Sequence, residues 1–581
     1  MLLAGLLLVL GQTVVRALVV VPSYYWQDDF VHLYLARELG LSREFLVRDH
    51  NDHLEIGANL LHWLLGRTAT TSFLPAALGL LGLQLIASLL LLALLRELFG
   101  RSPWLLVPFA GYLFTPLALP VATWWSSGLE ALPLQIGMLL ALLGLVRALR
   151  RRSAGWAAVS VAGHALGLLA YEKALLVLPT LIAVLVLVEW AGVPAGRRLG
   201  LLARNWRYLL GHVLLVAAYV PLYLAVVDPS PGTESDGGSA GAWVGYTVFR
   251  LLLPGMFGGP WTSPESDDDT RLPPVEEPVA VALAVLAVAV VALSVWLRGR
   301  RALAGWLLVA GYVAVDLALV VVGRSRLLEM VTGDPRYLAD ALPVVAIGCC
   351  AAFSGPLVQR RVPRWLPRLA GSLAAALAVS APLVAGAVVS TALVAEEMQH
   401  RQSRDYVAAV LQAMADRPGA SVVSSQPPWD VNIFGYPGLR EMMLALGRDV
   451  DFDLPGTEMH MFDGSGELRP ITVIGRLQAS GPVPGCGWPV NPGGQRLAEL
   501  ARGTGAAEVV RLGYLAGEGA TLTLAVGDDE QELRVPPGAG QAFFVVTGQH
   551  GPVEIRADDA GASGVCVSDL VAGSPWPADG P

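Results

Sequence analysis

Apolar residues in the first two thirds of the chain form blocks of about 20 residues, separated by short polar segments. A helix needs about 20 apolar residues to cross the hydrocarbon core of a bilayer. The blocks therefore predict a polytopic α-helical membrane protein with about eleven spanning helices. Their approximate ranges are 2–21, 74–95, 103–121, 129–147, 155–172, 174–191, 208–227, 278–297, 303–322, 337–356 and 370–394. The chain thus divides into a transmembrane domain, 1–395, and a second domain, 396–581.

Clusters of arginine occupy every second connection between the predicted spans. They are Arg96 and Arg101; Arg147, Arg150, Arg151 and Arg152; Arg197, Arg198, Arg204 and Arg207; Arg298, Arg300 and Arg301; and Arg360, Arg361, Arg364 and Arg368. The positive-inside rule places such connections in the cytoplasm. We therefore expect a cytoplasmic N-terminus, two long exported loops at 22–73 and 228–277, and an extracytoplasmic C-terminal domain. The first loop has two apolar segments that suit surface helices.

The C-terminal domain shows a different pattern. A helix is expected at 401–416, and from about residue 470 short apolar runs alternate with Gly, Asp and Pro turns. Such spacing predicts an exported, mainly β domain of the sandwich or jelly-roll type. Cys486 and Cys566 lie in this domain, where a disulfide can persist; free thiols are the alternative.

Composition agrees with this picture, since 54% of residues are hydrophobic and 15% are charged. The basic residues are almost all arginine, and Lys173 is the only lysine. The Ala-, Gly-, Leu- and Arg-rich composition suggests a bacterial source and hence the bacterial plasma membrane. No Walker A loop or CxxC pair occurs, which argues against an ATP-driven pump. The GxSxG match at 237–241 lies in the Gly-, Ser- and Asp-rich second long loop and does not follow a predicted strand, which argues against the nucleophile elbow of a serine hydrolase. We expect membrane lipid as a partner and no nucleic acid.

The first candidate site is the pair Asp28 and Asp29, directly after the first span. Adjacent carboxylates repel each other, so a divalent cation, Mg²⁺, Mn²⁺ or Ca²⁺, is one interpretation. A second is that one of them accepts a proton from an attacking hydroxyl. A third needs no chemistry: both residues begin a surface helix, where negative charge is favourable.

Further polar residues are predicted to lie at the same outer level. Asp52, His53 and Glu55 follow in the first exported loop and could bind a sugar or complete a metal site; a solvated turn is the alternative. Glu172 and Lys173 lie between two close spans, where ionisable groups are costly and often functional. Arg336 and Tyr337 open a later span, and an Arg guanidinium or Lys173 could bind the phosphate of a lipid.

An acidic pair in the first exported loop of a multispanning protein resembles the GT-C superfamily of glycosyltransferases, of the protein mannosyltransferase or aminoarabinose transferase type. That resemblance rests on Asp28-Asp29 and on the whole layout. It implies inverting transfer of a sugar from a polyprenyl-phosphate donor to an exported glycan, lipid or protein acceptor. Asp28 or Asp29 would then be the base that activates the acceptor hydroxyl, and the other would orient it or hold metal.

Three other functions remain open from the sequence. A flippase or transporter of lipid-linked glycans would use the same lipid, but no internal repeat is apparent. A polymerase or ligase of lipid-linked glycans would also act at the outer face. A non-enzymatic membrane scaffold would bind glycans through its exported domain.

Overall fold

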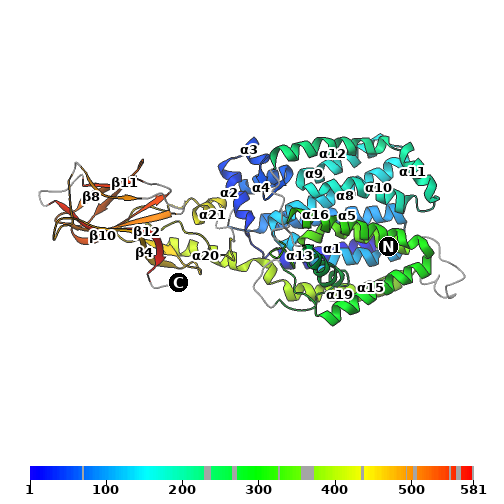
Figure 1. Ribbon diagram of the computed structural model, residues 1–581. Coiled ribbons are helices and arrows are strands. Elements are labelled where there is room, and N and C mark those ends of the chain that lie inside the picture. Colours follow the sequence, from blue (N-terminus) through cyan, green and yellow to red (C-terminus); the bar gives the residue numbers. More distant parts are fainter. Residues whose placement is uncertain are drawn as a thin grey trace. The chain divides into compact units, whose positions relative to one another are not determined.

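The computed structural model describes residues 1–68, 71–227, 237–264, 271–324, 328–354, 372–432, 438–491, 494–500, 507–547, 551–557 and 564–578. The chain forms two compact units, Met1–Arg401 and Gln402–Pro581. Figure 1 shows that the first is helical and that strands gather in the second. The predicted fold class is confirmed in this respect.

The first unit is built from long apolar helices. Those that coincide with predicted spans are α1 (Leu2–Val20), α5 (Leu74–Phe99), α8 (Trp125–Arg151), α9 (Ala154–Ala170), α10 (Val177–Val184), α12 (Arg207–Val226), α15 (Glu277–Arg298), α16 (Leu303–Gly323), α17 (Leu342–Phe353) and α19 (Leu373–Val394). The predicted span at 103–121 is broken into η1 (Pro103–Leu105), α6 (Leu106–Phe114), η2 (Pro116–Ala118) and α7 (Pro120–Thr123). Two prolines interrupt its hydrogen-bond ladder, and the parts meet at an angle of 45°.

Within the described residues, seven segments are long and apolar enough to cross a membrane, or eight if the broken span counts as one. The chain is therefore a multi-pass membrane protein. The number of spans stays a prediction, because α9 and α10 are short and α15 with α16 counts as one segment of 47 residues. The arginine cluster at 360–368 lies outside the described residues.

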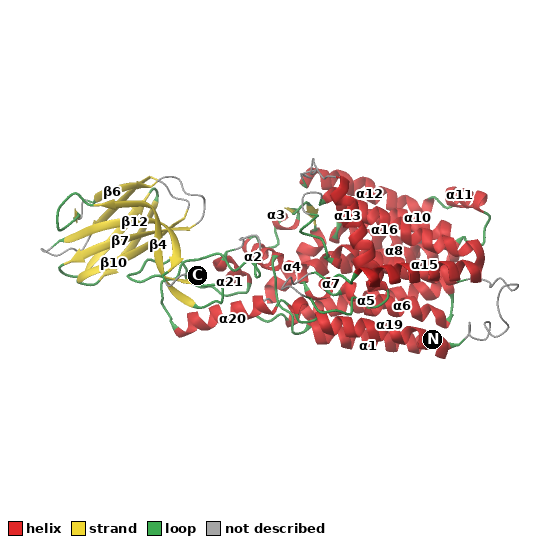
Figure 2. Cartoon of the chain, turned by 60° about the horizontal axis from the view of Figure 1, so that its bottom comes forward, coloured by secondary structure: helices red, strands yellow, loops and turns green. Residues whose placement is uncertain are grey.

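Helix α8 lies among the other spans and packs against α5 and α9 (Figure 2). Small residues let α8 and α9 approach closely. A Cβ atom on Gly137 would lie 2.5 Å from the carbonyl oxygen of Gly163, so any larger residue would separate the helices. This close contact fixes the start of α8, where several candidate site residues lie.

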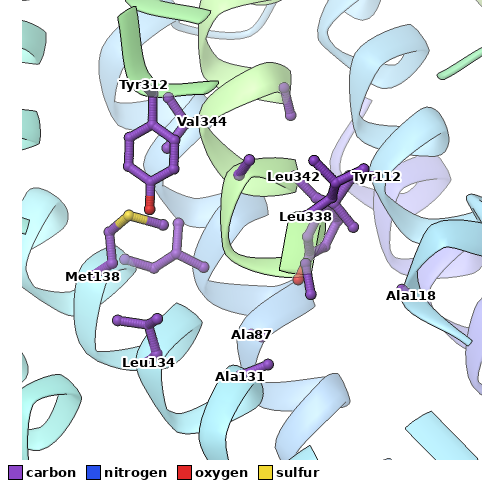
Figure 3. Close-up of a cluster of buried hydrophobic side chains, with 14 of the residues drawn as sticks. Ala87, Tyr112, Ala118, Ala131, Leu134, Met138, Tyr312, Leu338, Leu342 and Val344 are labelled. Atoms are coloured by element: carbon purple, nitrogen blue, oxygen red, sulfur yellow. The ribbon is translucent and has the colours of Figure 1, made fainter. Parts of the chain in front are cut away.

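The core of the unit consists of aliphatic and aromatic side chains from α5, α6, α8, α16 and α17. Figure 3 shows Met138 of α8 next to the hydroxyl end of Tyr312, and Leu338 and Leu342 near Tyr112. The segment η8 (Pro335–Ala341) runs directly into α17 and is packed into this core. Side chains on η8 are therefore held in place by the spans around them.

The first long loop folds into α2 (Asp28–Glu38), α3 (Arg43–Leu46), a β1 (Asp49–His50) and β2 (His53–Leu54) hairpin, and α4 (Ile56–Thr68). Helices α2 and α4 coincide with the two expected surface helices, and they pack against each other. The second long loop contains α13 (Gly237–Tyr246), η5 (Thr247–Leu252) and α14 (Leu253–Met256), and its residues 228–236 and 265–270 lie outside the described part.

The shorter segments η3 (Glu172–Leu176), η4 (Leu185–Glu189), α11 (Ala195–Arg204), η6 (Gly299–Ala302) and η10 (Glu397–Gln399) connect the spans or follow the last one. Two helices, α20 (Arg401–Asp416) and α21 (Leu439–Ala445), precede the strands. The strands are β3 (His460–Phe462), β4 (Leu468–Ser480), β5 (Trp488–Val490), β6 (Gln495–Leu500), β7 (Ala507–Ala516), β8 (Ala520–Val526), β9 (Asp529–Val535), β10 (Gly538–Thr547), β11 (Gly551–Ala557) and β12 (Val565–Pro577).

The second unit is a β-sandwich. One sheet has the order β10-β7-β12-β4-β3, with β5 paired to β12, and the other has the order β6-β11-β8-β9. Alternate residues of both sheets, such as Val510 and Leu524, share one apolar core. Cys486 and Cys566 form a disulfide with an S–S distance of 2.00 Å. The units divide between Arg401 and Gln402, close to the predicted boundary of 395/396.

Candidate active site

A small cavity of about 50 Å³ opens at one end of the helical unit. It is lined by Asp28, His50, Asn51, His53, Ser127, Glu130, Ala131, Tyr171, Arg324, Arg336, Tyr337 and Asp340. These residues come from the first long loop, the start of α8, the end of α9, the end of α16 and η8. Polar side chains thus converge from segments that are far apart in the sequence.

Asp28 and Asp29 face different surroundings. The side chain of Asp28 lines the cavity, is 18% exposed, and lies 3.7 Å from Nε2 of His50. Asp29 is fully buried, and its Oδ1 accepts hydrogen bonds from the backbone N–H (2.8 Å) and hydroxyl (2.5 Å) of Ser126. Its Oδ2 accepts from the backbone N–H of Trp26 at 3.1 Å. Asp29 therefore fastens α2 to the first turn of α8, whereas Asp28 is available for chemistry.

The two carboxyl groups also differ in acidity. Burial raises the pKa of Asp28, but the hydrogen bond and charge of His50 and the charge of Arg336 outweigh it, so the net pKa is lowered. Burial raises the pKa of Asp29 to about 7, although the hydrogen bonds from Ser126 and Trp26 oppose the shift. At neutral pH Asp28 is ionised and suited to accept a proton or a cation.

The β1–β2 hairpin places two histidines at the cavity. Asn51 and Asp52 have φ angles of 53° and 67°, the left-handed conformation that a two-residue hairpin turn requires. His50 pairs with His53 across the hairpin, so that both rings line the cavity. The side chain of Asp52 does not line it; the backbone oxygen of Asp52 accepts a hydrogen bond from Tyr223 at 2.8 Å.

His53 is held between two charged residues. Its Nδ1 lies 2.7 Å from Oε1 of Glu172, and its Nε2 contacts the guanidinium of Arg324. Burial lowers the pKa of His53, but the charge and hydrogen bond of Glu172 raise it further, so the net pKa is raised. The structure thus brings the predicted residues His53 and Glu172 together, with Glu172 acting behind the cavity wall.

Glu55 does not line the cavity but lies in a buried cluster with His32 and His62, whose potential ligand atoms are within 4.8 Å of one another. Arg48 contacts Nδ1 of His32, and Trp125 Nε1 donates to Nδ1 of His62 at 3.1 Å.

When one ring nitrogen of a histidine binds a metal, the other ring nitrogen carries a proton. In His32 and His62 that proton would lie on Nδ1, where it would face the N–H donors of Arg48 and Trp125 and not an acceptor. The rings of His32 and His62 are also stacked, 4.1 Å apart and 7° from parallel, so one cation cannot lie in both ring planes. Burial lowers the pKa of both histidines and raises that of Glu55 well above the usual range. These three side chains fit a neutral packed cluster better than a cation site.

Arg336 and Tyr337 lie together in the cavity wall. The guanidinium of Arg336 donates to the hydroxyl of Tyr337 at 2.9 Å, pairs with Asp334 at 2.9 Å, and lies 4.5 Å above the ring of Trp124. Its side chain is 25% exposed. Arg324 lines the same cavity, so two guanidinium groups face it.

Lys173 has a different position from the one expected. Its ammonium group is buried and lies 2.7 Å from Asp316 and 3.2 Å from Asp340, and it donates to the backbone oxygen of Tyr337 at 3.0 Å. Lys173 is not among the lining residues, although Asp340 is. A direct contact of Lys173 with a lipid phosphate therefore stays a prediction that this geometry does not favour.

The sequence suggested that Glu130, together with residues 124–127, could line an outer cavity, although an interfacial aromatic belt was the favoured interpretation of this segment. The carboxylate of Glu130 lines the cavity one turn after Ser126, and among the residues that the structure describes no hydrogen bond or ion pair engages it. Arg324 also lines the cavity; in the sequence it lies in the same short loop as Arg336. Asp340 was missed, although it lies within a predicted span, where an ionisable residue is costly; that signal could have identified it.

No family model matches the chain, and no curated protein matches it in sequence. Among solved structures, ArnT from Cupriavidus metallidurans bound to undecaprenyl phosphate is similar, with 17% identity, a TM-score of 0.44, and coverage of 81% of this chain and 96% of that one. The same protein in the apo state matches with 16% identity, a TM-score of 0.43, and coverage of 77% and 85%. ArnT is an aminoarabinose transferase of the GT-C superfamily.

Proposed function

We propose that the chain is a glycosyltransferase that moves a sugar from a polyprenyl-phosphate donor to an acceptor hydroxyl in this cavity. The proposal rests on one observation: carboxylates and guanidinium groups line the same cavity. Asp28 and Glu130 supply carboxylates, and Arg324 and Arg336 supply guanidinium groups. A lipid phosphate needs cations at the level of its headgroup, and an acceptor hydroxyl needs a base.

In this mechanism the acceptor oxygen attacks the anomeric carbon from the face opposite the phosphate. A new carbon–oxygen bond forms while the bond to the phosphate oxygen breaks, and the lipid phosphate leaves with the electron pair. Asp28 takes the hydroxyl proton, because it is ionised and open to the cavity. Arg336 stabilises the charge on the leaving phosphate. The configuration at the sugar is therefore inverted.

Asp29 is a positioning residue in this scheme. Both of its oxygens already accept hydrogen bonds, so it cannot readily serve as a base or a metal ligand. A divalent cation remains part of the proposal, and in the cavity it would have Asp28 and Glu130 as its carboxylate ligands. Such a cation would help to hold the donor phosphate.

The ion pairs at the opposite ends of the helices favour an enzyme over a flippase. There Glu97 of α5 pairs with Arg147 at 3.0 Å, and Arg150 pairs with both Glu97 and Glu189. Arg147 is 17 residues beyond Glu130 on α8, or about 25 Å at 1.5 Å per residue. A transporter would have to open this network to pass its cargo.

By the arginine distribution, the cavity faces the outside and the ion-paired end faces the cytoplasm. The acceptor is then an exported glycan, lipid or protein, and the N-terminus is cytoplasmic. The C-terminal sandwich would be extracytoplasmic, where its disulfide is stable.

A transfer assay tests the proposal. The purified full chain in lipid nanodiscs is incubated with a panel of radiolabelled polyprenyl-phosphate sugars and bacterial envelope acceptors. We expect release of sugar from at least one donor, and a loss of about 10²–10⁴-fold in Asp28→Asn. Glu44→Gln, a change on the exposed face of α3, is the matched control and keeps the wild-type rate. An Asp28→Asn protein that transfers sugar at the wild-type rate would exclude Asp28 as the base.

A further inference from the structure

The single lysine of the chain forms an ion triad inside the helical unit. Lys173 contacts Asp316 on α16 and Asp340 on η8 (2.7 and 3.2 Å), and all three side chains are at most 6% exposed. The ammonium group also donates to the backbone oxygen of Tyr337. It therefore ties η3 to two other segments at the edge of the cavity.

Asp340 connects this triad to the cavity. It lines the cavity on the same short helix as Arg336. Its Oδ1 lies against Lys173, and its Oδ2 accepts a hydrogen bond from Tyr312 at 2.9 Å. Figure 3 shows the ring of Tyr312 reaching into the core with its hydroxyl at the inner end. Both carboxylate oxygens are thus drawn toward the protein interior.

A carboxylate at this place has two effects on an anionic ligand. It repels the ligand directly, and it competes for the guanidinium groups that should bind the ligand. Lys173, which Asp316 shares, offsets part of the negative charge of Asp340, and the Asp340 oxygens are directed away from the cavity by Lys173 and Tyr312. This arrangement leaves Arg336 to face a phosphate.

We propose that Lys173 is a positioning residue for binding of the lipid phosphate: it holds and neutralises Asp340, and so keeps Arg336 available to the phosphate. This inference rests on the proposed function, since it assumes a phosphate in the cavity. It assigns to Lys173 an indirect role in place of the direct contact expected from the sequence. The alternative is that the triad only anchors the fold.

Two double variants separate these roles. Lys173→Met with Asp340→Asn leaves Asp316 as the only carboxylate of the triad, and Lys173→Met with Asp316→Asn leaves Asp340. The two double variants have the same net charge. If the triad only anchors the fold, they should therefore bind the lipid phosphate with similar affinity. A role in phosphate binding predicts that only the loss of Asp340 restores affinity.

The measurement is the dissociation constant of undecaprenyl phosphate for the full chain in nanodiscs, with thermal unfolding recorded in parallel. We expect Lys173→Met to weaken binding about tenfold, the change that one partly buried charge produces. The double variant lacking Asp340 should return to within about threefold of wild type, and the one lacking Asp316 should stay weak. If Lys173→Met alone does not fold, the two double variants still decide the question.

The possible failures are distinct. If the wild-type chain does not bind undecaprenyl phosphate but folds normally, the proposed function is wrong and the role of Lys173 falls with it. If the wild type binds and Lys173→Met binds equally well, only the inference about Lys173 is overturned. Equal recovery in both double variants would likewise overturn it and identify the triad as a fold anchor.

Discussion

Substitutions of the neighbouring residues Asp28 and Asp29 should have different effects: loss of Asp29 should lower stability, and loss of Asp28 should lower activity. Asp29→Ala leaves three donors without an acceptor in a fully buried place: the backbone N–H and the hydroxyl of Ser126, and the backbone N–H of Trp26. Each buried unsatisfied donor costs about 1–3 kcal/mol, and the losses are not additive. We expect destabilisation of about 3–5 kcal/mol.

Asp28→Asn should leave stability almost unchanged. Among the residues that the structure describes, Asp28 forms one ion pair, the 3.7 Å contact with His50, and we expect it to contribute about 1 kcal/mol or less. Its effect should instead be the loss of sugar transfer described above.

The free cysteines provide the assay. Cys349 and Cys350 both lie in α17, whereas Cys486 and Cys566 are joined in the sandwich. A thiol-reactive fluorescent dye therefore reports unfolding of the helical unit alone. We expect the midpoint temperature to fall by several degrees in Asp29→Ala and to remain at the wild-type value in Asp28→Asn. A normal midpoint in Asp29→Ala, or a large drop in Asp28→Asn, would refute the assignment of the two roles.

Three further changes test other parts of the account. Arg336→Gln should weaken undecaprenyl phosphate binding about 10- to 100-fold in the nanodisc assay, because charge-assisted hydrogen bonds to the phosphate are lost. Arg298→Gln, at the opposite end of the helices, is the control and should bind as tightly as the wild type. Equal affinities of the two variants would remove Arg336 from the site. Cys486→Ser with Cys566→Ser should destabilise the sandwich by about 4 kcal/mol in denaturant unfolding followed by tryptophan fluorescence, since the bond closes a loop with a sequence separation of 80 residues; an unchanged midpoint would contradict this. The pKa of Asp29 is about 7 in the folded protein and 3.8 in the unfolded chain, so its contribution to stability is greatest below pH 4 and is lost as the pH rises to about 7. Asp29→Asn should therefore flatten this part of a plot of melting temperature against pH. A plot identical to that of the wild type would refute the raised pKa.

The sequence predicted the positions of the apolar helices because each one is a local property, whereas the number of spans stays a prediction. A block of apolar residues specifies a membrane helix without reference to the rest of the chain, and Arg clusters mark alternate ends. The sandwich followed from period-two patterns and turn residues. The break between α6 and α7 was not predicted, although Pro116 and Pro120 indicate it.

The site was predicted less completely because it depends on contacts between distant segments. His53 meets Glu172 and Arg324, which are 119 and 271 residues further along the chain. No local pattern could show that Asp28 faces the cavity while Asp29 faces α8, since the two are adjacent. The same applies to Lys173, whose partners lie on two other segments.

A structure of the full chain with undecaprenyl phosphate bound, in nanodiscs, tests the central claim most directly. The account predicts phosphate density at the guanidinium groups of Arg336 and Arg324, with the lipid tail running along the outside of the helices. Asp28 should lie on the opposite side of the space where a sugar would attach. Phosphate density at the arginine-rich end near Arg147, or a lipid path through the middle of the bundle, would contradict the account and favour transport.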